Sequence, residues 1–295
     1  SILPCVTGEK IVMRLLDKSG FEFTLMNIGF EEDMLAIFKK WIHRPYGIVV
    51  VSGPTGSGKS TTLHAALKEI QSTEINISTV EDPVEYQVPG INQVQVSDKI
   101  GLTFAAALRS ILRQDPDVCL LGEIRDQETA DMAVKFSLTG HLVFSTVHAN
   151  DAPATITRLV DMGLAPYLVG SSLNLVMAQR LVRRVCDNCK EEYMITPQEL
   201  EMLNLDEDEY KGRMLWRGRG CSHCRNTGYK GRTAIFEILE ITPAIRRLIF
   251  SNADQDIIRE KALQLGMITL RESGLRKLFN GITTVQEIMK TTIEE

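Results

Sequence analysis

Short apolar runs alternate along the first part of the chain with longer segments in which apolar residues recur at helical spacing. The apolar runs predict buried strands at residues 48–51, 75–81, 118–121 and 142–146. Apolar positions three and four apart predict helices at residues 31–42, 61–70, 104–113, 127–138, 152–162 and 166–182. Because strands that alternate with helices form a parallel sheet covered on both faces, the sequence predicts an α/β fold.

The two ends of the chain follow other patterns. Residues 10–16 and 21–25 flank a polar stretch and predict a hairpin. From residue 235 to the end the pattern is helical, and Pro243 is expected to open one of these helices. Residues 186–234 lie between these helices and the α/β part. Their composition differs from both, because the segment is polar and contains four cysteines.

Composition and charge exclude several classes of protein. With 44% hydrophobic and 24% charged residues, the chain has the composition of an ordinary globular protein. Its net charge of −5 provides no overall positive field, so no nucleic-acid partner is expected. No apolar run approaches the about 20 residues that span a bilayer, and no signal peptide is visible, so we expect peripheral membrane association only. The sequence opens at Ser1 within a strand-like pattern, and we expect its natural N-terminus to lie upstream.

A glycine-rich segment between a buried strand and a helix is the strongest chemical signal, because it matches the pattern G-x-x-x-x-G-K-[ST]. Its glycines allow backbone N–H groups to approach phosphates, and the following helix presents its N-terminus to the anion. Lys59 is expected to reach the β- and γ-phosphates, and the Ser60 hydroxyl to bind Mg²⁺. The alternative, a glycine-rich turn without nucleotide, is disfavoured by the strand–loop–helix context. We predict ATP binding by Gly53, Pro54, Thr55, Gly56, Ser57, Gly58, Lys59, Ser60 and Thr61.

Carboxylates follow two of the predicted strands. Glu123 comes just after the 118–121 strand, at the Walker B position. Many P-loop enzymes carry Asp there, and the longer side chain of Glu is expected to hold Mg²⁺ through water. The acidic segment 81–85 follows the 75–81 strand, and Pro83 fixes a turn that aims Glu85 at the phosphates. A carboxylate in that place orients the attacking water, whereas the alternative is a solvated turn.

Histidines and arginines allow two interpretations each. His141 and His148 flank the 142–146 strand, and His148 is either a sensor of the γ-phosphate or a structural histidine. Arg109 and Arg113 lie one helical turn apart. They either reach a neighbouring subunit's nucleotide or form ordinary ion pairs. A similar choice, between a ring interface and solvent, applies to the basic cluster of Arg180, Arg183 and Arg184.

Cysteines occur in two C-x-x-C pairs, with two further cysteines that stand alone. Four thiolates at this spacing suit a closed tetrahedral zinc site with a structural role, at Cys186, Cys189, Cys221 and Cys224. The gap between the pairs is longer than usual, so a helix near residues 197–203 is expected within it. Disulfides or redox exchange are the alternative. Cys119, inside an apolar run, is interpreted as a small buried hydrophobic residue.

Four motifs in order resemble those of the type II/type IV secretion ATPase superfamily, in its GspE/PilB branch. They are a Walker A loop at 53–61, an Asp box at 79–85, a Walker B segment at 112–126 and a His box at 139–148. The resemblance covers essentially the whole chain, and the order of the motifs makes it more specific than any one of them. It implies a RecA-like P-loop NTPase core.

The resemblance also implies catalytic roles for single residues. Glu85 is similar to the family's catalytic glutamate and Glu123 to its Walker B carboxylate, beside the P-loop lysine, Lys59. His148 resembles the His-box residue near the γ-phosphate, with His141 in a supporting place.

The N-terminal residues resemble the end of a further, PAS-like domain of the family, in which Arg14 would contact nucleotide phosphates. The resulting division is a remnant of that domain with a linker (1–28), a RecA-like ATPase domain (29–185), a zinc-binding tetracysteine module (186–234) and a helical C-terminal module (235–295). The tetracysteine module resembles the extension and secretion motors, since retraction ATPases of the related branch lack it.

The function implied by the resemblance is that of an ATP-hydrolysing hexameric motor at the cytoplasmic face of the inner membrane. It would drive type IV pilus assembly or type II secretion through an inner-membrane platform protein, with ATP, Mg²⁺ and Zn²⁺ as cofactors. Two other classes are weighed against it. A nucleic-acid translocase is disfavoured by the net charge. A scaffold that does not hydrolyse nucleotide has no need of a water-orienting acid such as Glu85.

Overall fold

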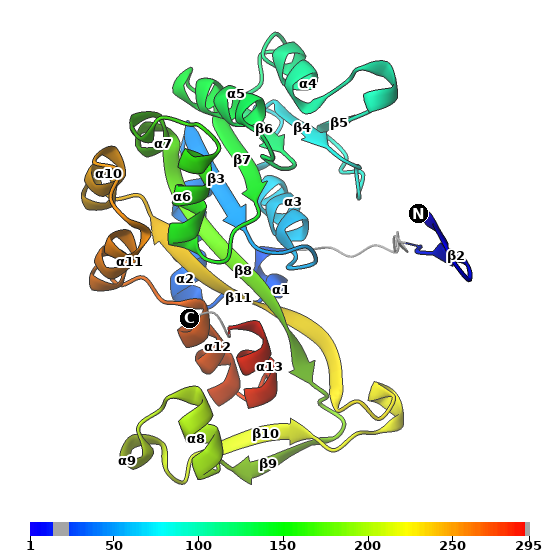
Figure 1. Cartoon of the computed structure of the whole chain (residues 1–295), viewed down its shortest axis with the longest axis vertical. Helices are drawn as coiled ribbons and strands as arrows, with labels where there is room; N and C mark the ends of the chain where they lie inside the picture. Colours follow the sequence, from blue (N-terminus) through cyan, green and yellow to red (C-terminus); the bar gives the residue numbers. More distant parts are fainter. Residues whose placement is uncertain (14–23, 293–295) are drawn as a thin grey trace.

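A seven-stranded sheet forms the centre of the molecule, and helices cover both of its faces (Figure 1). The computed structural model describes residues 1–13 and 24–292. The strand order is β11-β8-β3-β7-β6-β4-β5, with β11 antiparallel to β8 and all other neighbours parallel. The strands are Gly47–Ser52 (β3), Ile77–Glu81 (β4), Asn92–Gln95 (β5), Val118–Leu121 (β6), Leu142–Val147 (β7), Leu173–Val185 (β8) and Tyr229–Glu240 (β11). The predicted α/β fold is confirmed.

The buried strands show why apolar runs predict this sheet. In β3, Ile48 and Val50 belong to the core on one face, whereas Val49 and Val51 belong to the core on the other. Because successive side chains of a strand point to opposite faces, a strand covered on both sides needs an unbroken apolar run. All four predicted strands are present, with ends that differ from the prediction by at most two residues.

The helices divide between the two faces of the sheet. Helices α1 to α3 contribute to one core, and α4 to α7 with α10 and α11 contribute to the other. Their bounds are Leu25–Ile28 (α1), Glu32–Ile42 (α2), Lys59–Ile70 (α3), Phe104–Ile111 (α4), Gln127–Leu138 (α5), Ala152–Asp161 (α6), Pro166–Ser172 (α7), Pro243–Phe250 (α10) and Gln255–Gln264 (α11), with a short 3-10 helix at Asp98–Ile100.

Polar side chains fix the points at which several helices begin. Asp126 accepts a hydrogen bond from the backbone N–H of Thr129, and Asp151 accepts one from Ala154. Such caps satisfy N–H groups that have no partner within the first turn. The helices predicted at residues 127–138 and 152–162 are confirmed, and Pro243 opens α10 as expected.

The helix predicted at residues 166–182 is wrong beyond Ser172. Helix α7 ends there, and the chain continues as the long strand β8, which pairs with β3 on one side and β11 on the other. The segment is rich in Leu, Met, Ala, Gln and Arg, all good helix formers. Pairing with both neighbours and burial within the sheet override that local preference.

The helical pattern predicted from residue 235 onward is wrong for its first residues, because β11 extends to Glu240. The helices begin at Pro243 and end with α12 (Leu270–Phe279) and α13 (Val285–Thr291). Strand β11 therefore continues across the predicted border at residue 234, and the division into domains stays a prediction.

The cysteine-containing segment forms a small unit at one end of the molecule (Figure 1). It holds the antiparallel pair β9 (Lys190–Met194) and β10 (Met214–Gly218), helix α9 (Glu207–Tyr210) and a 3-10 helix at Ser222–Cys224. The helix expected near residues 197–203 is confirmed as α8, Pro197–Leu203.

The N-terminal hairpin lies apart from the sheet in Figure 1. It pairs β1 (Ile2–Cys5) with β2 (Gly8–Ile11), and all residues of both strands are exposed. The hairpin predicted at residues 10–16 and 21–25 falls mostly on residues 14–23, outside the described residues, and Leu25 begins α1.

Candidate active site and metal centre

A cleft of about 440 Å³ opens where β3, β4, β6 and β7 end. Because the carboxyl ends of parallel strands meet at one edge of a sheet, loops from separate strands converge there. Most of the predicted site residues line this cleft, namely Thr55, Gly56, Ser57, Gly58, Lys59, Ser60, Thr61, Glu85, Glu123 and His148. Gly53 and Pro54 lie directly before them in the chain. Arg14 lies outside the described residues, so its role stays an expectation.

The phosphate loop needs glycine for its backbone conformation and for close packing. Gly53 has φ 144° and Gly58 has φ 88°, in the region that side chains rarely adopt. A Cβ on Gly53 would lie 2.5 Å from the Gln179 carbonyl oxygen, and one on Gly58 would lie 2.8 Å from the Gln179 side-chain nitrogen. The loop therefore packs against β8 at both glycines.

Lys59 lies folded onto this loop. Its Nζ donates hydrogen bonds to the carbonyl oxygens of Gly53, at 2.7 Å, and Pro54, at 3.0 Å. Burial lowers the pKa of Lys59; the negative charge of Glu123 opposes this, and the positive charge of Arg180 adds to it. An anion in the cleft would therefore favour the charged ammonium.

Gln179 of β8 supports the loop and is not among the residues predicted from the sequence. It is fully buried; its Nε2 donates to the carbonyl oxygen of Ser57 and its Oε1 accepts from the Thr62 hydroxyl, both at 2.8 Å. The segment was predicted as a helix, and a helix does not place Gln179 beside the phosphate loop as strand β8 does. The available signal was an amide side chain directly after the apolar run 175–178.

Glu123 lies between two basic side chains. One of its oxygens pairs with the Arg125 guanidinium, and the other lies 3.6 Å from His148 Nε2. Glu123 is mostly buried, with 16% of its side chain exposed, whereas 51% of the His148 side chain is exposed. The structure thus brings together two residues predicted on separate strands. It adds Arg125, which belongs to the Walker B segment but was not identified as a site residue.

A buried ion pair joins the first residue of the acidic segment 81–85 to helix α3. His64 Nε2 of α3 is 3.2 Å from a carboxylate oxygen of Glu81, and both residues line the cleft. Burial disfavours the charged form of each group, but their contact outweighs it, so the pKa of His64 is raised and that of Glu81 is lowered. His64 is not among the residues predicted from the sequence.

Other basic residues have partners away from the cleft. His141 precedes β7, at the strand end opposite His148, and its ring packs against Phe136 with centroids 4.5 Å apart. His141 is not among the described residues that line the cleft, so it lies away from the site at which it was expected to support His148. Arg109 pairs with Glu128 at 3.0 Å, which favours the ordinary ion-pair interpretation.

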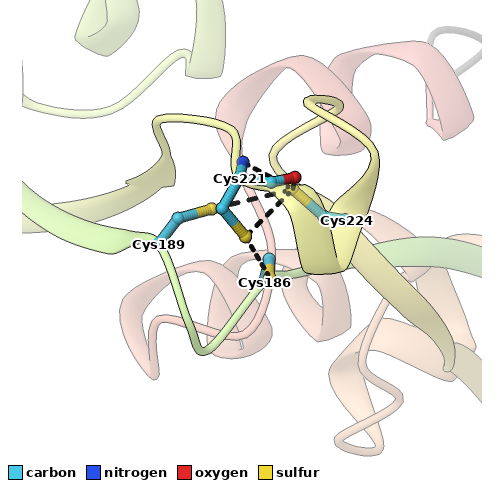
Figure 2. A group of neighbouring side chains, drawn as sticks. All are labelled: Cys186, Cys189, Cys221 and Cys224. Atoms are coloured by element: carbon cyan, nitrogen blue, oxygen red, sulfur yellow. Dashed lines mark hydrogen bonds between the residues drawn. The ribbon is translucent and has the colours of Figure 1, made fainter.

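The four paired cysteines converge in the small unit (Figure 2). The Sγ–Sγ distances are 3.7 Å for Cys221–Cys224, 3.8 Å for Cys189–Cys224 and 3.9 Å for Cys186–Cys221. Sulfurs at the corners of a tetrahedron around zinc, with Zn–S bonds of about 2.3 Å, would be about 3.8 Å apart. A disulfide bond is about 2 Å long, and all four thiols are free. The sulfur positions fit a zinc ion and contradict the disulfide alternative.

The thiol of Cys224 has an environment suited to a metal-bound thiolate. Its Sγ accepts hydrogen bonds from the backbone N–H groups of Cys221, at 3.2 Å, and Gly228, at 3.3 Å. Burial opposes the thiolate, but these donors outweigh it and lower the pKa of Cys224 to about 6. By contrast, burial raises the pKa of the isolated Cys119 to about 12, which agrees with its interpretation as a buried hydrophobic residue.

A phosphate loop after the central strand β3, with acids that follow the parallel strands β4 and β6 of the same sheet, defines a P-loop NTPase of the α/β class. The chain matches the family model described as type II/IV secretion system protein over residues 1–290, and it belongs to that family.

Two curated relatives illustrate the family. The chain is 49% identical over 293 residues to the type IV pilus assembly ATPase PilB of Myxococcus xanthus, covering 99% of this chain and 52% of the relative. It is 47% identical over 294 residues to the type II secretion system ATPase E of Vibrio cholerae, covering 100% of this chain and 58% of the relative. The chain thus spans little more than half the length of these two relatives.

A solved structure supports the same fold. The pilus retraction motor PilT with bound ADP aligns with a TM-score of 0.70 at 29% identity, covering 95% of this chain and 69% of that one. Within the described residues, we find no helix with both the length and the apolar character to cross a bilayer.

Proposed function

We propose that this chain is the ATP-hydrolysing part of a hexameric motor that drives type IV pilus assembly or type II secretion. The observation that carries the proposal is the cleft that gathers the phosphate loop, Glu85, Glu123 and His148. An inner-membrane platform protein is the proposed partner, so the motor would act at the cytoplasmic face of the inner membrane. The link to pili or secretion is supported by the names of the relatives.

The proposed roles follow from the positions around the cleft. The loop with Lys59 binds the phosphates, and Glu85 orients the attacking water. Ser60 and Glu123 line the same cleft and offer a hydroxyl and a carboxylate, oxygen ligands that suit Mg²⁺. The ion supplies neutralisation of phosphate charge when bound. His148, beside Glu123, is placed to respond to the γ-phosphate.

Zinc is proposed as a structural ion. Four sulfur ligands fill its coordination, which leaves no open position for chemistry. Three of the four cysteines are buried, and none of the four is among the described residues that line the cleft. The role of the ion would therefore be to hold the small unit together.

Steady-state hydrolysis of Mg·ATP tests the proposal, with sedimentation velocity run on the same samples. The wild-type chain should hydrolyse ATP with an activity that rises with assembly. Glu85→Gln should bind ATP without hydrolysing it, and Lys59→Ala should lose binding. Glu207→Gln is the control, because Glu207 is an exposed acid on α9 in the small unit.

Two results would contradict the motor. Hydrolysis that rises on addition of single- or double-stranded DNA would favour a nucleic-acid translocase. ATP binding by the wild type with no hydrolysis in any assembled state would favour a scaffold.

A further inference from the structure

The segment that carries Glu85 has no regular structure of its own. Residues 82–88 form neither helix nor strand between β4 and β5. A side chain that orients water must nevertheless be held in place, since a displacement of about 1 Å can lower a rate by about 100-fold. The neighbouring edge strand β5 provides that support through two glutamines, Gln93 and Gln95.

Gln93 uses both ends of its side-chain amide on this segment. Its Nε2 donates to the carbonyl oxygen of Tyr86, at 2.8 Å, and its Oε1 accepts from the N–H of Val88, at 2.7 Å. Tyr86 directly follows Glu85. Gln95, two residues along and therefore on the same face of β5, accepts from the N–H of the residue that precedes Glu85, at 3.2 Å. The backbone is thus held on both sides of Glu85.

The Gln93 amide is also connected, through Glu81, to helix α3, which follows the phosphate loop. Gln93 Nε2 also donates to a carboxylate oxygen of Glu81, at 3.1 Å, and the other oxygen of Glu81 faces His64 of α3. His64 in turn contacts the carbonyl oxygen of Ser60 through Nδ1, at 2.8 Å. A continuous series of polar contacts therefore runs from the first turn of α3 to the backbone beside Glu85.

We propose that Gln93 is a positioning residue for Glu85, which it holds against the helix that follows the phosphate loop through Glu81 and His64. The proposal rests on the role of Glu85 in the proposed function. Gln93 would touch neither ATP nor the attacking water, so its effect would pass wholly through the placement of Glu85.

The test compares Gln93→Met, which keeps the length of the side chain and removes its hydrogen bonds, with the wild type in Mg·ATP hydrolysis. The kcat should fall by about 10- to 100-fold. The KM for ATP should stay within about twofold, because the phosphate loop is untouched. Asn92→Leu is the matched control: Asn92 is the preceding residue of β5, and its amide donates to Asn76 instead.

A double-mutant cycle separates positioning from a merely structural role. In a Glu85→Asp background the carboxylate is already displaced, so Gln93→Met should lower kcat by less than about threefold. The same factor in both backgrounds, or a raised KM with unchanged kcat, would overturn the assignment. If Gln93→Met is insoluble, Gln93→Glu takes its place in the cycle. It sets a second carboxylate against Glu81, and a wild-type kcat for it would equally refute the proposal.

The two proposals fail in different ways. If Glu85→Asp lowers kcat and Gln93→Met does not, only the assignment of Gln93 is overturned. If Glu85→Asp retains the wild-type kcat, the water-orienting role fails and the assignment of Gln93 fails with it.

Discussion

A buried lysine joins the C-terminal helices to the chain just before α2. Lys277 of α12 is 5% exposed; its Nζ lies 2.7 Å from a carboxylate oxygen of Glu31 and donates to the carbonyl oxygen of Gly29. The neighbouring residue of α12, Arg276, pairs with Asp33 at the same distance of 2.7 Å, but these side chains are 40% and 53% exposed. The two ion pairs join α12 to the same end of α2 and differ mainly in burial.

Lys277→Met keeps the apolar stem and removes the charge. Breaking a buried ion pair by removing one partner costs about 3–5 kcal/mol, because the other charge stays buried. Only 16% of the Glu31 side chain is exposed, which gives limited access to water, so we expect a loss of about 3 kcal/mol. Arg276→Met should cost less than about 1 kcal/mol, because exposed pairs contribute little. Adding Glu31→Gln to Lys277→Met removes the stranded charge and should recover about half of the loss.

Urea unfolding followed by tryptophan fluorescence measures these changes, since Trp41 lies on α2. Wild type, Lys277→Met, Glu31→Gln and the double variant that combines them give the coupling energy between Glu31 and Lys277. Burial would be refuted as the deciding factor if Lys277→Met shifts the midpoint no more than Arg276→Met. A double variant less stable than Lys277→Met alone would also contradict the reasoning.

Three further predictions concern other sites. Cys224→Ser should lower bound zinc, measured by mass spectrometry, from about one ion per chain to a small fraction, whereas the exposed Cys5→Ser should retain it. Gln179→Leu leaves two buried groups of the phosphate loop and α3 without these hydrogen bonds, at about 1–3 kcal/mol each, and calorimetry should show ATP binding at least about tenfold weaker. The raised pKa of His64 gives stability that is complete below pH 6.5 and is lost as pH rises through the folded-state pKa of His64. The lowered pKa of Glu81 gives stability that is complete above pH 4.5 and is lost as pH falls through the folded-state pKa of Glu81. The stability difference between wild type and His64→Phe in urea should therefore be greatest between pH 4.5 and 6.5, and a difference that stays constant far into alkaline pH would contradict this.

The parts predicted correctly from the sequence are those whose determinants are local. An unbroken apolar run is sufficient to indicate β3, and the glycines of the phosphate loop match a fixed pattern. The spacing of the cysteine pairs likewise indicates a cluster that the structure brings together. In each case, residues close in sequence carry most of the signal.

The missed parts depend on contacts between distant residues. Strand β8 consists mostly of good helix formers and becomes a strand because β3 and β11 lie on either side of it. Gln179 contacts Thr62, 117 residues away in sequence, and Gln93 holds a loop whose shape no local pattern predicts. No periodicity in the sequence reports such pairings, so the residues that support the predicted site could not be found although its principal residues were.

Strand β8 also relates the cleft to the cysteine cluster. Gln179 contacts the phosphate loop, Leu181 lines the cleft, and the strand ends directly before Cys186. Strand β11 returns beside it, with Arg232 at the cleft, and the N–H of Cys186 donates to the carbonyl oxygen of Gly228, at 2.9 Å, just before β11 begins. An ion held by the four sulfurs would therefore fasten the far end of this antiparallel pair. A two-stranded antiparallel ribbon, such as β8 with β11, is only marginally stable on its own. Removal of zinc with a chelator should therefore weaken ATP binding in calorimetry, although the metal centre lies outside the cleft. Added zinc should restore the affinity. An unchanged affinity in the zinc-free protein would show that the ribbon holds its shape at the cleft without the ion.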